Sequence, residues 1–380
     1  MVDNDSVHSL TVGGHGYYHS SILDNESIDL FRNGGFYSDD LKAEAHKRLG
    51  NLNYLGGESS FKVEYSYGDT LIPEVNSGFY VQYERGVSGG VLFSKGLYET
   101  VFYGNQFNLG DTTWLSRVEM AQYAFHKFGG GVNFNNRLKL GLSIMSFDSY
   151  QYGSLDRAFM YTPETLDSVY LDARGEFESG SGTGIGLDFE IVSNFFTPDS
   201  VSDVGRFFIV GVRNLGAYFG KPSTQHYRLD TAISYQGFEV SQFTDVSNTL
   251  FEGYSQDSLL PDPIQKGSLA LLPAELYFYS PVNPIGKKVQ AIYGFRYRIR
   301  SVTQAMLMLG MDYRNKKNNH YRLYAVAGGY GYFQFGASVN KHFGPINLGV
   351  AFNNVHGMFS KEGYGKSLGI SMSYDFKYKK

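Results

Sequence analysis

The 380-residue chain has no cysteine and only one tryptophan. Without cysteine, a disulfide scaffold, a thiolate metal site and a cysteine nucleophile are all excluded. No run of about 18 apolar residues occurs, which excludes a transmembrane helix. The net charge is −4, so the basic excess that is typical of nucleic-acid-binding proteins is also missing. We therefore expect no nucleic-acid partner and no thiol chemistry.

Aromatic residues and glycine are abundant, with 31 Tyr, 30 Phe and 46 Gly. Aromatic side chains suit a pleated, half-buried surface, and glycine marks turns, bulges and close approaches between backbones. This composition is typical of an all-β protein. It leaves open whether the apolar face of the sheet points toward a core or toward lipid.

Apolar and polar residues alternate strictly in many segments, which predicts β-strands. In the clearest example, Leu368, Ile370 and Met372 alternate with small or polar residues up to the end of the chain. The same period of two occurs over residues 60–67, 137–144, 184–191, 289–296 and 346–352. Turn residues separate several of these segments, at Asn135-Asn136, at Gly344-Pro345 and between Asn315 and Asn319.

Three features favour a membrane barrel over a soluble β-sandwich. The segments are about 9–12 residues long, which matches a tilted crossing of the hydrocarbon layer, whereas strands in general average about 5–6. Aromatic residues gather at segment ends, as in the girdles of membrane barrels. The chain also ends on an alternating aromatic strand that can close a barrel. The mean hydropathy of −0.27 is compatible with this, because only alternate residues touch lipid.

The expected fold is an all-β, transmembrane, antiparallel up-and-down barrel formed by residues 1–380 as one domain. Six strands fit between about residue 287 and the C-terminus, and the same spacing predicts fourteen strands for the whole chain. The even-number rule for bacterial barrels accepts fourteen and also tolerates 12 or 16.

Two insertions interrupt the β pattern, at residues 20–57 and 104–118. Within the first, Ser38 to Leu49 has a helical N-cap, acidic residues in its first turn and basic residues in its last. We therefore expect one or two short helical insertions. Each insertion is expected to be an extracellular loop or a plug that lies in the lumen.

No catalytic, cofactor-binding or metal-binding residues are predicted, and we expect a protein that is not an enzyme. His15 and His19 share a strand face but are about 13 Å apart, too far to hold one metal ion. The glycine-rich segment from Gly180 to Gly186 lacks the lysine of a phosphate loop, and we expect it to form a tight turn.

Charged residues in the polar register of the strands form a candidate lumen charge ladder. The candidates are Arg296, Arg298, Arg300, Glu64, Asp188 and Glu190, with Asp230 and Asp312 as further carboxylates. A structural ladder of ion pairs is one interpretation, since arginine without a carboxylate partner is costly to bury. A constriction that selects anions is the other.

Residues 1–10 are polar and acidic and do not resemble an export signal. A barrel of this kind must be exported, so we expect a mature chain in the bacterial outer membrane, from which the signal peptide has been removed. Outer-membrane lipid is then an expected partner.

Several segments resemble a known family of barrels. They are Tyr332 to Phe376, with FQFGASVNKHFGPINLGVAFNNV and KSLGISMSYDF, then GVRNLG (Gly211 to Gly216), LPAELYF (Leu272 to Phe278) and NFNNRLKLGLSIMSF (Asn133 to Phe147). They are similar to Bacteroidota outer-membrane barrels related to the PorV/PorP type and to long-chain fatty-acid transporter-like barrels. The resemblance implies a 14-stranded barrel and, for some relatives, a role in type IX secretion.

Two functions follow from these observations. The first is a non-enzymatic partner or scaffold subunit of an outer-membrane export or assembly complex, with a filled lumen and protein partners. The alternative is a passive channel for hydrophobic or small solutes, similar to the fatty-acid transporters, with an apolar pocket in the barrel. The polar and charged lumen register favours the first.

Overall fold

The computed structural model describes residues 6–72, 75–134, 137–165, 168–194, 207–235, 262–280, 288–315, 317 and 319–378. The turn expected at Asn135-Asn136 lies outside these ranges. Four short α-helices are present in the described part, where one or two were expected. They are α1 (Asn25–Asn33), α2 (Asp39–Lys47), α3 (Lys95–Tyr103) and α6 (Val355–Phe359). A short 3-10 helix, η1 (Asn105–Asn108), follows α3. No described helix is both long and apolar enough to cross a membrane.

The strands pair into one antiparallel sheet. They are β1 (Ser6–Ser20), β2 (Leu52–Ile72), β3 (Val75–Ser94), β4 (Thr112–Trp114), β5 (Val118–Phe134), β6 (Leu138–Tyr161), β7 (Val169–Asn194), β8 (Phe207–Gly220), β9 (Gln225–Tyr235), β10 (Ile264–Gln265), β11 (Ser268–Leu271), β12 (Glu275–Tyr279), β13 (Val289–Arg298), β14 (Met306–Arg314), β15 (His320–Ala327), β16 (Phe333–Phe343), β17 (Ile346–Phe352) and β18 (Gly365–Tyr378).

These segments make a closed 14-stranded barrel, as the sequence predicts. β4 and β5 both pair with β6 and together count as one barrel strand. β8 and β9 together follow β7, and β10, β11 and β12 follow β9 and β8 in the same way. β18 closes the barrel by pairing along β1 from Ser6↔Tyr378 to His19↔Gly365. The six strands expected after residue 287 are β13 to β18.

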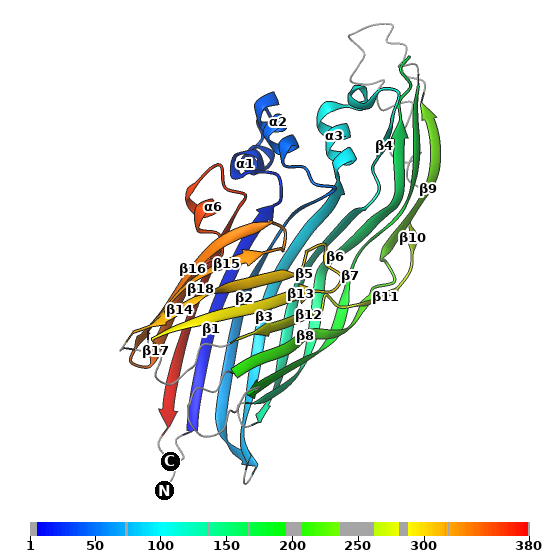
Figure 1. Ribbon diagram of the computed structural model, residues 1–380. Helices are drawn as coiled ribbons and strands as arrows, with labels where there is room; N and C mark the ends of the chain where they lie inside the picture. Colours follow the sequence, from blue (N-terminus) through cyan, green and yellow to red (C-terminus); the bar gives the residue numbers. More distant parts are fainter. Residues whose placement is uncertain are drawn as a thin grey trace.

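The two ends of the barrel differ (Figure 1). Both chain termini lie at one end, where short turns such as Gly344-Pro345 join the strands. The four α-helices lie at the other end, which we call the loop end. α2 forms where the sequence predicts it, with Ser38 as the N-cap that accepts a hydrogen bond from the Leu41 backbone N–H at 3.4 Å. α1 and α3 begin in the same way at Asp24 and Ser94.

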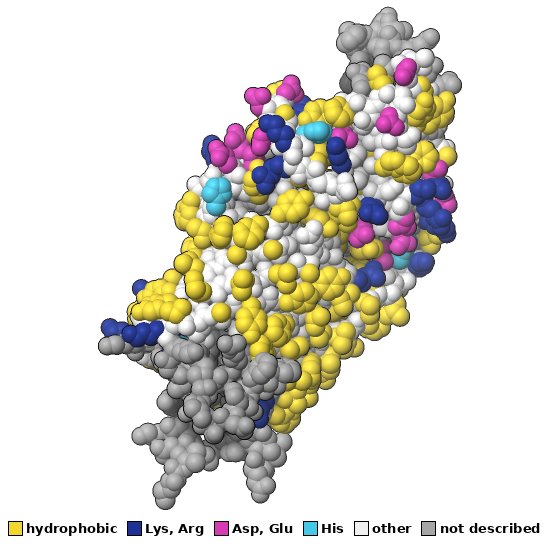
Figure 2. All heavy atoms as spheres, viewed as in Figure 1, with side chains coloured by type: hydrophobic (Ala, Val, Ile, Leu, Met, Phe, Trp, Pro, Cys, Tyr) yellow, Lys and Arg dark blue, Asp and Glu magenta, His cyan; other side chains and the backbone are white. Residues whose placement is uncertain are grey.

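The outer wall of the barrel is apolar, because the strand alternation points one face of each strand outward. Leu142, Ile144, Leu323 and Ile370 are all strongly exposed, which a soluble protein would avoid. Figure 2 shows hydrophobic side chains spread over the barrel wall, while most of the charged side chains in this view gather toward the loop end. This is the apolar band that a lipid-facing barrel requires.

The glycine-rich segment from Gly180 to Gly186 is strand rather than turn, so that prediction is wrong. It lies within β7, and its glycines leave room for large side chains from the adjacent strand β8 and from the segment that follows β11. A Cβ added to Gly182 would meet Tyr218 at 2.7 Å, and one added to Gly184 would meet Leu272 at 2.7 Å. Close packing inside the barrel, not turn geometry, therefore explains these glycines.

Replacing Leu323 by arginine should destabilise the barrel because it places a charge on the lipid-facing wall. We expect the free energy of unfolding in lipid vesicles to fall by about 2–4 kcal/mol, as is typical for a charge near the middle of the bilayer. Phe343→Arg, at the terminus end of β16, is the matched control and should cost at most about 1 kcal/mol. Equal, small losses for both variants in denaturant titrations would contradict a lipid-facing Leu323.

Candidate functional site

A cluster of four charged side chains lies inside the barrel. Arg296 donates to Glu58 at 2.6 Å and to Glu275 at 2.7 Å. Arg298 also bonds to both carboxylates, at 2.9 Å for Glu275. Each arginine thus shares two carboxylates with the other, which offsets the cost of removing these charges from bulk water. We call these four residues the charge cluster.

The strand register explains this arrangement. Glu275 of β12 lies directly opposite Arg298 of β13, and Arg296 is two residues away on the same face. Glu58 reaches the arginines from β2, on the far side of the lumen. The cluster therefore ties opposite walls of the barrel together. Arg298 also donates to the Tyr123 hydroxyl on β5 at 3.3 Å.

On the loop-end side of the charge cluster, two inter-strand loops fold into the lumen. Residues 299–305 join β13 to β14, and residues 328–332 join β15 to β16. Val302 and Tyr330, one from each loop, are buried together against Ala121 and other side chains of β1, β2, β3 and β6. A backbone hydrogen bond from Gln304 to Gly329, 3.1 Å long, joins the loops. We call the two loops the inner plug.

The Tyr330 ring of the inner plug packs against the backbone of two glycines, Gly56 and Gly90, and we call the space beside them the notch. A Cβ added to Gly56 of β2 would lie 2.4 Å from the Tyr330 ring, and one added to Gly90 of β3 would lie 2.3 Å from it. Any larger residue at either position would push the ring out. The ring is only 2% exposed. Glycine at these two positions therefore fixes how deeply the loop enters the barrel.

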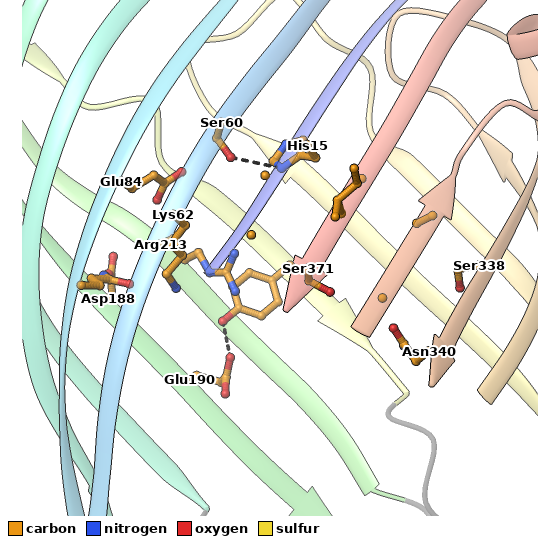
Figure 3. Close-up of a pocket in the computed structure, with 18 of the residues that line it drawn as sticks. His15, Ser60, Lys62, Glu84, Asp188, Glu190, Arg213, Ser338, Asn340 and Ser371 are labelled. Carbon is orange, nitrogen blue, oxygen red and sulfur yellow. Dashed lines mark hydrogen bonds between the residues drawn. The ribbon is translucent and has the colours of Figure 1, made fainter. Parts of the chain in front are cut away.

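Between the charge cluster and the terminus end, the lumen contains a cavity of about 450 Å³, a size usual for small-molecule sites. Figure 3 shows this cavity with charged residues on one side and uncharged polar residues on the other. The charged wall carries Lys62, Glu84, Lys127, Lys139, Asp188, Glu190 and Arg213, and Arg322 adds a further cation. The uncharged wall carries Ser338, Asn340 and Ser371 with glycines from β1, β17 and β18.

Most of the charges that line the cavity are paired. Lys127 donates to both oxygens of Asp188, at 2.7 and 3.0 Å, and to the Asn214 side chain at 2.6 Å. Arg322 bonds to Asp312 at 3.0 Å.

Glu64 forms ion pairs with Lys62 at 2.8 Å and with Lys139 at 3.5 Å. Glu190 accepts from the Tyr277 hydroxyl at 2.6 Å. These contacts give most of the charged groups on this wall a partner, as expected for charges inside a barrel.

Arg213 differs from these residues. Its guanidinium lies 4.7 Å from the centre of the Tyr277 ring, and among the described residues it forms no ion pair. Its side chain is exposed, although it belongs to the inner wall. Figure 3 shows it among the other labelled residues that line the cavity.

A β-bulge next to Arg213 shapes this part of the wall. The pairing of β7 with β8 shifts between Leu187 and Phe189, so Arg213 and Asn214 together oppose Asp188. Asn214 has a positive φ of 57°, and its backbone N–H donates to Asp188 at 2.8 Å. Bulges often re-aim a side chain at functional sites.

The six residues that the sequence predicts as one charge ladder do not form a single ladder in the structure. Arg296 and Arg298 belong to the charge cluster, whereas Glu64, Asp188 and Glu190 line or border the cavity and bond to lysines or tyrosine. Arg300 has left the strand: its φ is 52°, and it lies over the Tyr152 ring at 4.8 Å. Asp230 faces Arg174 across β7 and β9.

Sequence reasoning missed the residues that matter most here. Glu58 lies on the same strand face as Glu64, six residues earlier, so the alternation could have found it. Glu275, Lys127 and Arg213 needed the strand register, and Tyr330 needed knowledge that its loop folds inward. In the described part of the chain, no group of three or more His, Asp or Glu residues could hold a metal ion.

The fold and this interior define a transmembrane β-barrel with a largely polar lumen. No family model and no curated protein matches the chain.

Three similar solved structures are a TodX deltaS2S3 mutant monoaromatic hydrocarbon channel (TM-score 0.37, 8% identity, covering 99% of this chain and 91% of that one), a Pseudomonas aeruginosa FadL homologue (0.40, 10%, 98% and 90%) and the P. putida toluene transporter TodX (0.35, 9%, 99% and 91%). With TM-scores below 0.5, these likenesses carry no argument about the substrate.

Removing the Glu58 carboxylate should destabilise the barrel, because Arg296 and Arg298 would then share a single carboxylate. We expect Glu58→Gln to lower the free energy of unfolding by about 3–5 kcal/mol. Glu44→Gln, which breaks an exposed pair with Lys47, should cost at most about 1 kcal/mol. Similar values for the two variants in denaturant titrations would show that the charge cluster does not hold the walls together.

Proposed function

We propose that this protein is an outer-membrane channel for small polar solutes, with a lumen that the inner plug keeps closed. The observation that carries the proposal is the cavity of about 450 Å³ below the plug, which is lined by charged and hydroxyl side chains. A barrel that served only as a scaffold would need no such space. The plug consists of two inter-strand loops whose buried contacts inside the lumen centre on Val302 and Tyr330, so it can be withdrawn without breaking the barrel wall.

The orientation follows from the general plan of bacterial barrels, which place short turns in the periplasm and long loops outside. The loop end would then face the exterior, and the cavity would lie on the periplasmic side of the plug. A solute would pass the inner plug first and the charge cluster second.

The cavity lining favours a polar solute over a hydrophobic one. A hydrophobic solute needs an apolar pocket, because burying unpaired charges beside it is costly. Here the side chains of Lys62, Glu84 and Arg213 all line the cavity. The small-solute form of the channel hypothesis therefore agrees with the cavity better than the hydrophobic form does.

Loosening the inner plug should open the channel. We expect Tyr330→Ala to raise the permeability of reconstituted vesicles to small sugars at least several-fold, because the substitution empties the notch at Gly56 and Gly90. Vesicle swelling with glucose measures this directly.

Phe333→Ala is the matched control, since this neighbouring aromatic side chain is exposed on the outer wall. It should leave the permeability unchanged. If Tyr330→Ala folds, as judged by circular dichroism, and the vesicles remain impermeable, the channel proposal fails.

A second candidate is a subunit of an outer-membrane export complex, such as a type IX secretion-like assembly. The loop-end helices support it, because they carry a connected aromatic surface. Phe31 packs against Tyr37 and Phe102, at ring-centre distances of 5.0 and 5.9 Å, yet remains half exposed. Phe36 is 82% exposed on the same segment. Exposed aromatic patches of this kind mark protein interfaces.

The subunit hypothesis predicts stoichiometric partners in a tagged purification from native outer membranes. Phe36→Ser together with Phe31→Ser should release them and leave the barrel folded. Isolation of the barrel alone at low detergent would count against this candidate. That result would not affect the channel proposal.

A further inference from the structure

We propose that Arg213 is the anchor of an anion-binding subsite in the lumen, and that the solute it binds is a small, hydroxylated organic anion. This inference rests on the proposed channel function, since it names the chemical class that the same cavity accepts. The ligand would place a carboxylate or phosphate group against the Arg213 guanidinium.

Arg213 is the cation of this cavity that is left without an ion pair in the described part of the chain. Lys127 and Arg322 bond to carboxylates, and Lys62 and Lys139 share Glu64. The carboxylates across the strands from Arg213 already have cationic partners: Glu275 of β12 accepts from Arg296 and Arg298, and Asp188 of β7 accepts from Lys127. The guanidinium has five N–H donors, so it offers donors in a fork that fits a carboxylate or a phosphate.

The surroundings hold the Arg213 side chain in place before any ligand arrives. The Tyr277 ring packs against the Arg213 guanidinium, and the Tyr277 hydroxyl donates a hydrogen bond to Glu190. The ring can lie there because its neighbour across the sheet is Gly211: a Cβ at that position would be 2.3 Å from the ring. The bulge at Asp188 fixes the backbone next to Arg213. A pre-organised donor group binds its ligand with less loss of conformational entropy.

The pairing of the charges, rather than their number, favours an anion at Arg213. Five cationic and three carboxylate side chains line the cavity, and the carboxylates of Glu64 and Asp312 border it and pair with Lys62, Lys139 and Arg322. Glu84 is flanked across the sheet by Lys62 on one side and Lys127 on the other, so its charge is offset locally. An anion at Arg213 would give this guanidinium the ion pair that the other lining cations already have.

The opposite wall indicates what the rest of the ligand is like. Ser338, Asn340 and Ser371 supply hydroxyl and amide groups, and Gly13, Gly349 and Gly369 leave room beside them. No charged side chain is contributed by β16, β17 or β18 to this cavity. Such a wall suits the hydroxyl groups of a sugar acid or sugar phosphate better than an alkyl chain or a second charge.

The first test measures binding to the detergent-solubilised, full-length protein by equilibrium dialysis. Three probes of nearly equal size are compared: gluconate, glucose and glucosamine. We expect gluconate to bind at least about tenfold more tightly than glucose, because a hydrogen-bonded charge pair contributes about 1.5–3 kcal/mol. Glucosamine should bind most weakly.

The second test uses variants. Arg213→Gln should weaken gluconate binding about tenfold and leave glucose binding nearly unchanged. Arg213→Lys keeps the charge but loses the planar fork, and it should give an intermediate affinity. Arg157→Gln removes an arginine that is paired with Asp172 away from the cavity, and it serves as the control. Circular dichroism and heat-modifiable migration check that each variant is folded.

The outcomes separate this inference from the proposed function. Equal affinities of the wild-type protein for gluconate and glucose would overturn the subsite, even if every Arg213 variant failed to fold. Vesicles with Tyr330→Ala that pass glucose and gluconate at equal rates, with equal binding, would keep the channel and reject the anion preference. Arg213-dependent gluconate binding without any permeation would keep the subsite and reject the channel.

Discussion

The whole structure depends on one constraint: a backbone that crosses lipid must satisfy all of its hydrogen bonds within the protein. The pairing of β1 with β18 meets it by closing the sheet, so no strand edge faces the hydrocarbon layer. Closure sends alternate side chains outward to lipid and inward to the lumen. The outer face can then be apolar throughout, and charges that serve a function have only the interior available to them. Inside, each charge needs a partner, which is why Arg296 and Arg298 share Glu58 and Glu275 so completely.

The interior combines two kinds of packing. Toward the loop end, Tyr330 packs into the lumen because Gly56 and Gly90 leave room for its ring. Toward the terminus end, polar side chains and glycine leave a cavity. The charge cluster lies between the two and ties β2 to β12 and β13. The plug, the charge cluster and the cavity thus follow one another along the lumen, and Arg213 differs from the other lining cations because it forms no ion pair among the described residues.

Much of the fold could be predicted from sequence because period-two alternation is a local property. Leu368, Ile370 and Met372 reveal a lipid-facing strand without any knowledge of their neighbours. The site could not be predicted in the same way. Whether Arg296 meets Glu58 or Glu64 depends on register and on which strands lie across the lumen, and neither is encoded locally. The prediction for Gly180 to Gly186 was wrong for the same reason, because Tyr218 and Leu272 pack against these glycines from other segments of the chain.

The absence of cysteine allows one direct test of the central claim, which is that the inner plug closes a polar lumen. A single reporter cysteine at Asn340 lies in the cavity, and a membrane-impermeant thiol reagent can be added to intact cells. The account predicts little labelling of Asn340→Cys alone, and strong labelling when Tyr330→Ala is also present. Equally rapid labelling of both proteins from outside the cell would show that the plug does not close the lumen, and it would contradict the account.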